Sequence, residues 1–473
     1  MNNLYVFGIG GTGERVLKAL TFLLGTGIKI NVSKIIPIII DPDQAGGDNT
    51  AVVQIMRNYK TLYDDIKHPS QDINFFSTEI TPLQFGYTMS LGGATNVSFA
   101  SYMSFASLNN SDQALVNMLY SQDNQNMDMT IGFKGNPNVG STVLNQFSQS
   151  KDFMTFANDF TTGDGIFIIS SIFGGTGASG FPLLLKNLRA AQNIKPTLNS
   201  AAALANAPIG AVSVLPYFKL STDDRKNTID SNTFISKTKA ALTYYEKNLN
   251  NLTTMYYIGE QPQTTYNNVD GGAGQNNKSH FIELASALAI VDFAKNPGNN
   301  NKTIYKEFGI DSNKSDSISL GDLSPATQNT MEAPLVQFTL FCEFMKNRLQ
   351  FDIDSKQNWL TDNLIEFLRS NEKNTLDSYV NSFLDWLSEM GQNKQEFDPF
   401  NLPCKKDDVF HFVKGIEPKK VFSTKSNYDL ITDRLIKVSN KDIKGQKEKS
   451  LGEFLNVMNK GINRIVEEKL NIK

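Results

Sequence analysis

Residues 165–180 read GIFIISSIFGGTGASG, in which a short apolar run leads directly into a glycine-rich loop. The run Ile166–Ser170 has the length and aliphatic content of a buried strand. Because proline suits the first turn of a helix, we expect a helix to begin near Pro182. A turn between a strand and a helix presents unhindered N–H groups and the positive end of the helix dipole, which together bind phosphate. The candidate binding residues here are Gly174, Gly175, Thr176, Gly177, Ser179 and Gly180.

A second turn of the same kind opens the chain. The apolar run Leu4–Phe7 leads into GIGGTG, whose candidate residues are Gly8, Gly10, Gly11, Thr12 and Gly13. Taken alone, this loop matches the dinucleotide pattern G-x-G-x-x-G, with Asp41 and Asp43 after the next apolar run, and predicts an NAD(P)-dependent oxidoreductase. That alternative gives no reason for the second loop, whereas two such loops on adjacent strand ends can enclose a triphosphate.

The remaining apolar runs of the first 310 residues complete an α/β pattern. Strands are expected at Ile35–Ile40, Ala211–Leu215 and Met255–Ile258, separated by amphipathic stretches, which is typical of a Rossmann-like parallel sheet. Pro37 lacks the N–H that a central strand donates, so we expect the second strand to be short or kinked. The weakly patterned stretch Gln44–Asp128 is interpreted as helices and loops.

The chain divides near residue 310. Two glycine- and asparagine-rich stretches, Asn267–Lys278 and Asn296–Lys302, flank an apolar segment at about 280–294. We expect this segment to form a buried central helix that completes a nucleotide-binding domain at residues 1–310. From about Thr330 the apolar spacing becomes helical, which predicts a mostly α-helical C-terminal domain at residues 311–473.

Two apolar faces in the C-terminal domain allow more than one interpretation. Tyr379, Phe383 and Trp386 recur at helical spacing, which favours core packing over a ligand site. The amphipathic stretch Leu451–Ile465 could bind a partner helix or a membrane, but we expect it to dock on its own domain.

Charge and cysteine content argue against several functional classes. The 45 basic and 48 acidic residues give a formal net charge of −3, so no overall field attracts the chain to nucleic acid or an anionic membrane. Two cysteines and three scattered histidines offer neither a disulfide framework nor a metal-ligand spacing. There is no signal-peptide core and no run of about 18 apolar residues. We therefore expect a cytoplasmic protein with no membrane span and no direct nucleic-acid partner.

The two glycine-rich loops resemble those of the FtsZ/tubulin superfamily of GTPases. Gly8–Gly13 looks like the family's first phosphate loop, and Gly174–Gly180 looks like its signature loop. Phe173 stands where the signature has its first glycine.

Three further elements resemble the family in its order along the chain. Asp41-Pro42-Asp43-Gln44 takes the place of an Asn-Thr-Asp-like turn, and Asp43 matches by type. Gly132–Gly140 resembles the loop that senses the γ-phosphate, with Gly135, Asn136 and Pro137 as candidate binding residues. Val212–Phe218 is similar to the strand that precedes the ribose-contacting loop.

The resemblance implies a bacterial tubulin-like protein that binds GTP or GDP, with Mg²⁺ as an accompanying ion. It implies self-association into filaments or assembly with a tubulin-like hetero-partner, with the helical C-terminal region as a further partner-binding surface. It also implies GTP hydrolysis. A scaffold that keeps the fold without binding nucleotide remains an alternative.

Some family positions are not matched. Gly259-Glu260 stands where the family recognises guanine with an asparagine, and Glu283 is displaced from the family's acidic position near Ala285, so GTP and ATP both remain open. The stretch Asn296–Lys302 contains none of the carboxylates of the family's Asn-x-Asp-x-x-Asp/Glu loop, so no catalytic residue is assigned.

A few polar residues have two interpretations. Lys134 could neutralise phosphate charge or be solvated. Asp223, Asp224 and Arg225 follow the ribose-contacting position but equally fit a solvated turn. His280 precedes the central helix and is expected to be a cap or an interface residue rather than a general base.

Overall fold

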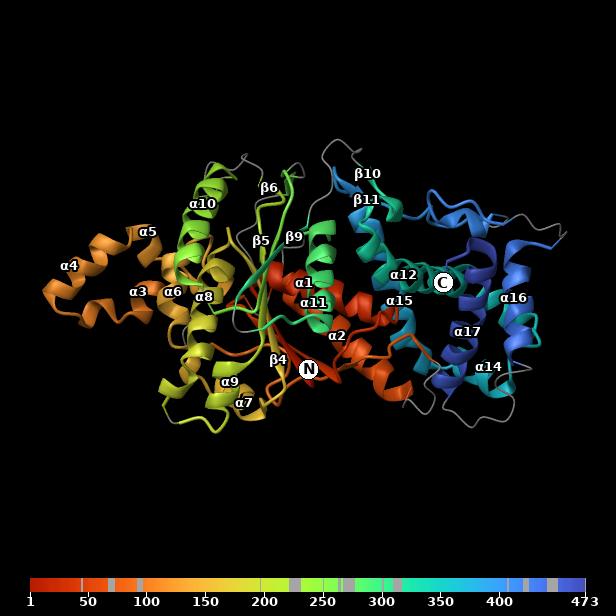
Figure 1. Cartoon of the computed structure of the whole chain (residues 1–473), viewed down its shortest axis with the longest axis horizontal. Coiled ribbons are helices and arrows are strands. Elements are labelled where there is room, and N and C mark those ends of the chain that lie inside the picture. The colour runs from red at the N-terminus through yellow and green to blue at the C-terminus, as the bar shows by residue number, and fades with distance from the viewer. Residues whose placement is uncertain are drawn as a thin grey trace.

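A seven-stranded, fully parallel sheet forms the centre of the first half of the chain (Figure 1), and the α/β prediction is confirmed. The computed structural model describes residues 1–43, 46–66, 73–91, 97–195, 197–220, 231–249, 251–262, 265–266, 277–299, 302–308, 317–405, 408–419, 425–439 and 450–472. In spatial order the strands are β3 (Glu79–Ile80), β2 (Lys34–Ile40), β1 (Asn3–Ile9), β4 (Gly165–Ser171), β5 (Ile209–Val214), β7 (Thr254–Ile258) and β9 (Ile304–Phe308). The sequence did not predict the two edge strands, β3 and β9.

Helices cover both faces of the sheet, as the alternating pattern predicts. One face carries α1 (Gly10–Gly25), α2 (Gly47–Ile66) and α11 (Phe281–Lys295). The other face carries α6 (Pro137–Leu144), α7 (Lys151–Asp159), α8 (Gly175–Arg189), α9 (Ala201–Asn206) and α10 (Ser231–Asn248) (Figure 1). Helix α11 is buried around nearly its whole circumference, which confirms the predicted central helix. A small two-stranded pair, β6 (Lys219–Leu220) and β8 (Thr265–Tyr266), lies outside the main sheet.

Proline 37 lies inside β2 without interrupting it, so the expectation of a short or kinked strand is wrong. Strand β2 keeps seven residues in register with β1, and Val6 faces Pro37. On the other side of β2, Ile39 donates its N–H to Tyr87 O (2.7 Å). Residues two apart in a strand point their N–H groups to the same side, so the N–H that Pro37 lacks would face the same side of β2 as that of Ile39. The short strand β3 pairs there only with residues 34 and 35, so no ladder hydrogen bond is lost.

Helix α8 begins at Gly175, inside the glycine-rich loop, rather than near Pro182 as the sequence suggested. Proline in a helix interior leaves the carbonyl four residues earlier without its donor. Here Tyr245 of α10 donates its hydroxyl to that carbonyl, Ala178 O, at 3.4 Å. The proline is therefore tolerated, and the glycines become the first turn of the helix.

A helical arm extends away from the body between β3 and α6 (Figure 1). It contains α3 (Phe99–Tyr102), α4 (Asn110–Leu119) and α5 (Gln122–Gln125). The expectation of helices and loops in this stretch is confirmed, apart from the two-residue strand β3 that precedes the arm.

The C-terminal region is mostly helical, as predicted. Its elements are β10 (Ser317–Ile318), α12 (Pro325–Asn347), α13 (Leu349–Asp354), α14 (Asp362–Arg369), α15 (Asn374–Met390), β11 (Glu396–Phe397), α16 (Asn427–Val438) and α17 (Ser450–Leu470). Helix α17 buries Leu451, Leu455, Met458 and Ile462 against its own region, which confirms the docking expected for it. The domain boundary predicted near residue 310 lies outside the described residues.

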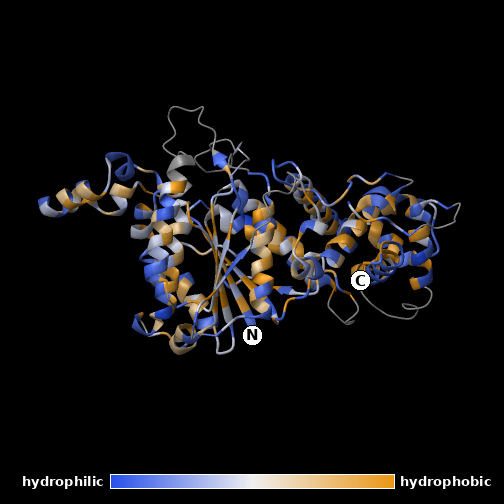
Figure 2. Cartoon of the chain, turned by 45° about the horizontal axis from the view of Figure 1, so that its top comes forward, coloured by the Kyte–Doolittle hydropathy of each residue, from blue (hydrophilic) through white to orange (hydrophobic). Residues whose placement is uncertain are grey.

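Aromatic side chains join α1 to the C-terminal helices. Phe22 of α1 is fully buried, and its ring lies 5.5 Å from Tyr379, 5.9 Å from Phe383 and 5.2 Å from Trp386. These three side chains of α15 are core residues, as their spacing predicted. Tyr379 also donates its hydroxyl to Thr21 O (2.8 Å), and a Cβ built on Gly25 would lie 2.3 Å from that hydroxyl. The two halves of the chain therefore share one core, in which hydrophobic residues concentrate (Figure 2).

Replacing Phe22 with alanine tests how far this shared core stabilises the protein. We expect Phe22→Ala to lower the free energy of unfolding by about 3–5 kcal/mol, because a large aromatic side chain is removed from a closed environment. Urea unfolding followed by circular dichroism measures the change. Phe351→Ala makes the same change at a 57% exposed position and should cost less than about 1 kcal/mol. Equal effects of the two substitutions would contradict the role of the aromatic contact.

Candidate functional site

The chain reverses its direction of travel across the sheet between β1 and β4. From β1 it proceeds outward to β2 and β3, and it then returns to place β4 on the other side of β1. At such a switch point the connections that follow two adjacent parallel strands lead to opposite faces of the sheet, and the crevice between them is the usual ligand site of open α/β sheets. Both glycine-rich loops follow these strands directly.

Three helices begin at this crevice without a side-chain cap. Helices α1, α8 and α6 have Ile9, Gly174 and Asn136 as N-caps, and none of these side chains bonds to the first turn. Elsewhere, α7, α11, α12 and α16 are each capped by a side chain, whereas α9, α13 and α15 also lack a side-chain cap. The first N–H groups of a helix have no partner within the helix, so an uncapped N-terminus can bind an anion.

The three loops lie against one another. Gly10 has a left-handed φ of +71°, and a Cβ built there would lie 3.3 Å from Thr176 Cβ and 3.5 Å from Gly177 N. A Cβ built on Gly175 would lie 3.0 Å from Gly135 N and 3.1 Å from Asn136 N. The structure therefore brings together the loops at residues 8–13, 132–140 and 174–180. Their partly exposed members include Gly11, Gly174 and residues 134–137.

Other candidate residues are buried against neighbouring backbone and side chains. A Cβ on Gly13 would lie 2.5 Å from Gly8 C, and one on Gly177 would lie 2.8 Å from Ser171 N, so both glycines permit close contact between strand and helix. Gly180 contacts Ile9 in the same way, and the Ser179 hydroxyl donates to Gly175 O (2.7 Å). These residues shape the loops from behind.

Two aspartates stand beside the first loop. Asp41 Oδ2 lies 3.9 Å from the Cβ position of Gly10, and the Asp43 N–H donates to Asp41 Oδ1 (3.0 Å). Burial raises the pKa of Asp41 to about 7, and the negative charges of Asp43 and Asp48 add to the rise. The described residues hold no cluster of three or more potential metal ligands. One or two carboxylates beside a phosphate site nevertheless suit Mg²⁺, which takes its other ligands from phosphate and water.

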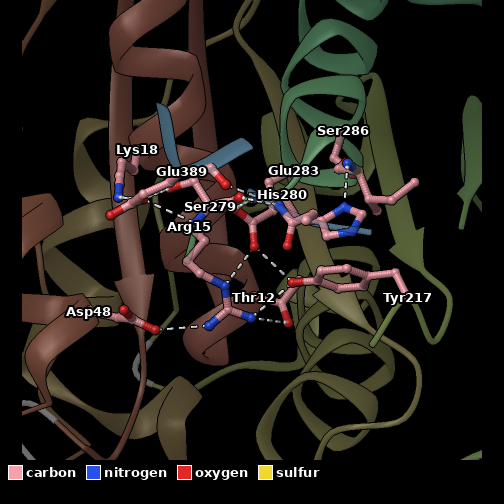
Figure 3. Close-up of polar contacts among 12 residues, drawn as sticks. Thr12, Arg15, Lys18, Asp48, Tyr217, Ser279, His280, Glu283, Ser286 and Glu389 are labelled. Atoms are coloured by element: carbon pink, nitrogen blue, oxygen red, sulfur yellow. Dashed lines mark hydrogen bonds and ion pairs between the residues drawn. The ribbon is translucent and has the colours of Figure 1, made fainter. Parts of the chain in front are cut away.

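A buried arginine, Arg15 of α1, lies at the centre of a polar network beside the first glycine-rich loop (Figure 3). Arg15 is 5% exposed and donates to Glu283 Oε1 (2.7 Å), Asp48 Oδ2 (2.8 Å), Tyr217 Oη (2.9 Å) and Thr12 Oγ1 (3.4 Å). Tyr217 in turn donates to Glu283 Oε1 (2.8 Å). The contacts join the starts of α1, α2 and α11 to the segment that follows β5.

This network continues into the C-terminal region. Lys18 of α1 lies 3.3 Å from Glu389 Oε2 of α15, and that carboxylate also accepts from Ser279 N (3.0 Å) and Ser279 Oγ (2.6 Å). His280 Nδ1 accepts from Ile282 N–H, and Glu283 Oε2 accepts from His280 N–H, which completes a capping box. The expected role of His280 as a cap is confirmed.

Sequence reasoning missed two cations at the site. Arg15 follows the first loop within an ordinary helical pattern, and only its proximity to Glu283 in space reveals its role. Lys237 of α10 donates to Gly135 O in the loop at residues 132–140, and burial lowers the pKa of Lys237. Lys134 has a left-handed φ of 43°, and its carbonyl accepts from Asn136 Nδ2 (3.1 Å).

Four further sequence predictions concern residues outside the three loops. Asp223, Asp224 and Arg225 lie outside the described residues. Glu260, where the family has a base-recognising asparagine, lies 3.1 Å from His280 Nε2. Among the helices that the structure describes, none is both long and apolar enough to cross a membrane. Cys342 and Cys404 are free thiols.

The raised pKa of Asp41 predicts a pH-dependent stability. A carboxyl whose pKa lies near 7 in the folded chain but at 3.8 in the unfolded chain favours unfolding as it ionises, so its destabilising effect grows as the pH rises from about 4 through about 7. We expect Asp41→Asn to raise the unfolding free energy by on the order of 2 kcal/mol at pH 8, and by much less below pH 5. Urea unfolding in chelator-containing buffer at both pH values measures the difference. A gain that does not change with pH would contradict the prediction.

Comparisons with known proteins are distant. No protein-family model matches the chain, and no curated protein matches it. Among solved structures, CetZ from Methanosaeta thermophila strain DSM 6194 aligns at 14% identity with a TM-score of 0.28, over 55% of this chain and 46% of that one. CetZ2 from Haloferax volcanii, solved as a GTPγS-bound protofilament, aligns at 13% identity with a TM-score of 0.29. The alignment covers 62% of this chain and 59% of that one. The TubZ-Bt two-stranded filament aligns at 12% identity with a TM-score of 0.23. The alignment covers 66% of this chain and 56% of that one.

Each alignment spans less than two thirds of the compared chain, and values at this level show no family. The fold class follows from the structure itself. The chain is an α/β protein with a seven-stranded parallel sheet, and a mostly helical region completes it.

Proposed function

We propose that the protein binds a nucleoside triphosphate or diphosphate, GTP or GDP in the first instance, at the crevice between β1 and β4. One observation carries the proposal: three uncapped helix N-termini, those of α1, α6 and α8, meet at the switch point of the sheet. Each offers backbone donors and a partial positive charge to an anion. Three such ends suit a polyphosphate better than a single phosphate group.

Two alternatives predict different behaviour. An NAD(P)-dependent oxidoreductase requires only the first loop and gives no reason for the contact between Gly175 and Gly135. A scaffold without nucleotide gives no reason for leaving three helix starts uncapped at one point. The preference for guanine rests on the FtsZ/tubulin resemblance alone, so GTP and ATP are compared in each test below.

The roles of the site residues follow from their positions. Gly11 and Gly174 are partly exposed and would offer backbone N–H groups to the phosphates, and Gly135 and Asn136 would contact the nucleotide from the loop at 132–140. Asp41 and Asp43 would hold Mg²⁺ against the phosphates, which would offset their negative charge beside the first loop. Arg15 holds the start of α1 in place through its contacts with Glu283 and Asp48.

We further propose self-association in the cytoplasm, as the FtsZ/tubulin resemblance implies, into filaments or a complex with a tubulin-like partner. The compared CetZ2 and TubZ-Bt structures are themselves assemblies. The contacts of Glu389 with Lys18 and Ser279 connect the middle of α1 to α15. This gives a physical route by which an occupied crevice could alter the helical C-terminal surface.

A substitution at Gly11 tests nucleotide binding at a position where a Cβ causes no close contact with the backbone. A Cβ there meets only Arg15 Nη1, at 3.5 Å, and Asp48 Oδ2, at 4.0 Å, whereas one at Gly177 would collide with the Ser171 backbone. We expect Gly11→Leu to weaken binding of a fluorescent GTP analogue at least about tenfold, because the side chain covers backbone donors to a charged group. Fluorescence anisotropy with Mg²⁺ measures the affinity.

Gly321→Leu is the matched control, because the nearest atom to its Cβ position is Ser319 Oγ at 3.9 Å and the residue lies in the C-terminal region, between β10 and α12. It should bind as the wild type does. Wild-type protein with no affinity for GTP or ATP would refute the proposal and favour the scaffold.

Hydrolysis is expected to be slow. The described part of the stretch after α11, Asn296–Asn299, contains no carboxylate to orient a water, and a well-placed catalytic group contributes about 10²–10⁴-fold. We expect phosphate release from GTP, and separately from ATP, to stay near background per molecule at every protein concentration. A rate per molecule that rises with concentration would contradict this and would indicate a catalytic site completed between subunits.

A further inference from the structure

Helix α10 carries three lysines, and one of them lies on the side that packs against the body. Lys237 is half-buried, whereas Lys239 and Lys247 are exposed. Tyr245, eight residues after Lys237, is buried and donates its hydroxyl to Ala178 O in the first turn of α8 (3.4 Å). Lys237 and Tyr245 therefore belong to the same inward side of α10.

The ammonium group of Lys237 lies at the N-terminal end of α8. An α-helix rises 1.5 Å per residue, so Lys237 is about 12 Å from Tyr245 along the axis of α10. Its ammonium donates to Gly135 O, and Gly135 N lies 3.0 Å from the Cβ position of Gly175, the first residue of α8. Gly135 also directly precedes Asn136, the N-cap of α6. Lys237 thus brings a positive charge to a point where two uncapped helices begin.

This positive charge has no anionic partner in the described part of the chain. The group that accepts from Lys237 is the neutral carbonyl of Gly135, and no carboxylate forms an ion pair with it. By contrast, Arg15 of the same site is bonded to two carboxylates, those of Glu283 and Asp48. Burial lowers the pKa of Lys237, because an ammonium that has lost part of its hydration is less favourable. An anion beside Lys237 would remove this cost.

A purely structural role does not require the charge. An uncharged side-chain donor could hold the carbonyl of Gly135 without the cost of burying an ammonium. A phosphate chain does require charge, because it brings several negative charges and each helix start supplies only about half of a positive one. Asp41 and Asp43 beside the first loop add further negative charge. The half-buried cation therefore favours an anionic ligand as its final partner.

We propose that Lys237 binds a phosphate group of the nucleotide, so that its ammonium leaves Gly135 O for a phosphate oxygen when the crevice is occupied. The flexible four-carbon stem of lysine allows this change without a movement of α10. The carbonyl of Gly135 then loses its donor, which makes the loop at 132–140 sensitive to the presence of nucleotide. The inference rests on the proposed nucleotide site and adds to it a residue that neutralises phosphate charge.

Nucleotide titrations of Lys237→Met and Lys239→Met test the contact. Both substitutions remove one lysine charge from α10, but Lys239 is exposed. We expect Lys237→Met to weaken binding of fluorescent GTP and ATP analogues at least about tenfold in fluorescence anisotropy with Mg²⁺, because a charge-assisted hydrogen bond is lost. Competition by inorganic tripolyphosphate should weaken by a similar factor. Lys239→Met should bind as the wild type does.

Two further variants separate the charge from the hydrogen bond to Gly135. Lys237→Gln keeps a donor without the charge and should bind as weakly as Lys237→Met, whereas Lys237→Arg keeps the charge and should bind more tightly than either. Circular dichroism and urea unfolding check that each variant is folded. Wild-type affinity in Lys237→Gln would overturn the proposal, since the lysine would then act only by holding the loop.

Acetylation of the wild type provides a test that needs no variant. Acetic anhydride modifies unprotonated amines, and mass spectrometry measures the rate at each lysine. Saturating GTP should slow the reaction at Lys237 and leave that at Lys239 unchanged, because a bound phosphate keeps the ammonium protonated. Equal rates at Lys237 with and without bound nucleotide would overturn the proposal.

The same titrations separate this inference from the proposed function. A wild type with no affinity for GTP or ATP would refute the nucleotide site itself, and the role of Lys237 with it. A wild type that binds nucleotide together with a Lys237→Met variant of equal affinity would refute the role of Lys237 alone.

Discussion

The site depends on close backbone contact between each strand and the helix that follows it. Gly13 lies against Gly8, and Gly177 lies against the backbone of Ser171, at distances that leave no room for a Cβ. Only this contact lets α1 and α8 start directly at the ends of β1 and β4, so that their first turns point into one crevice. The loop glycines therefore differ in their surroundings, since Gly13 and Gly177 pack strand against helix whereas Gly11 and Gly174 are partly exposed.

The buried charge of Arg15 is the second constraint. Burial penalises an ionised guanidinium, and this penalty is offset only because Glu283, Asp48, Tyr217 and Thr12 surround it. Removing any partner would leave a buried charge incompletely compensated. The arrangement therefore fixes the start of α1 relative to α2 and α11, and through Lys18 and Glu389 relative to α15.

The parts of the fold with local signals could be predicted from the sequence. Aliphatic runs gave five strands, and helical spacing gave the central helix and the C-terminal region. Errors arose where a distant residue compensates for a local rule. Pro182 is tolerated inside α8 because the Tyr245 hydroxyl donates to Ala178 O, the carbonyl that the proline leaves without a donor. Pro37 is tolerated inside β2 because β3 is too short to pair with it. Strand β9 was missed because its exposed Ile304 and Tyr305 lack the pattern of a buried strand. The glycine loops were found from local sequence, whereas Arg15 and Lys237 take on their roles only through tertiary contacts.

The contact between Gly25 and Tyr379 has an evolutionary consequence. Any side chain at position 25 would overlap the tyrosine ring, and that ring also anchors α15 to the carbonyl of Thr21. A homologous C-terminal region grafted by recombination would have to bring a compatible residue to position 379. A recombinant protein without such a residue would lose the contact between α1 and α15. The two halves of the chain are therefore expected to descend together, with positions 25 and 379 changing in concert across lineages.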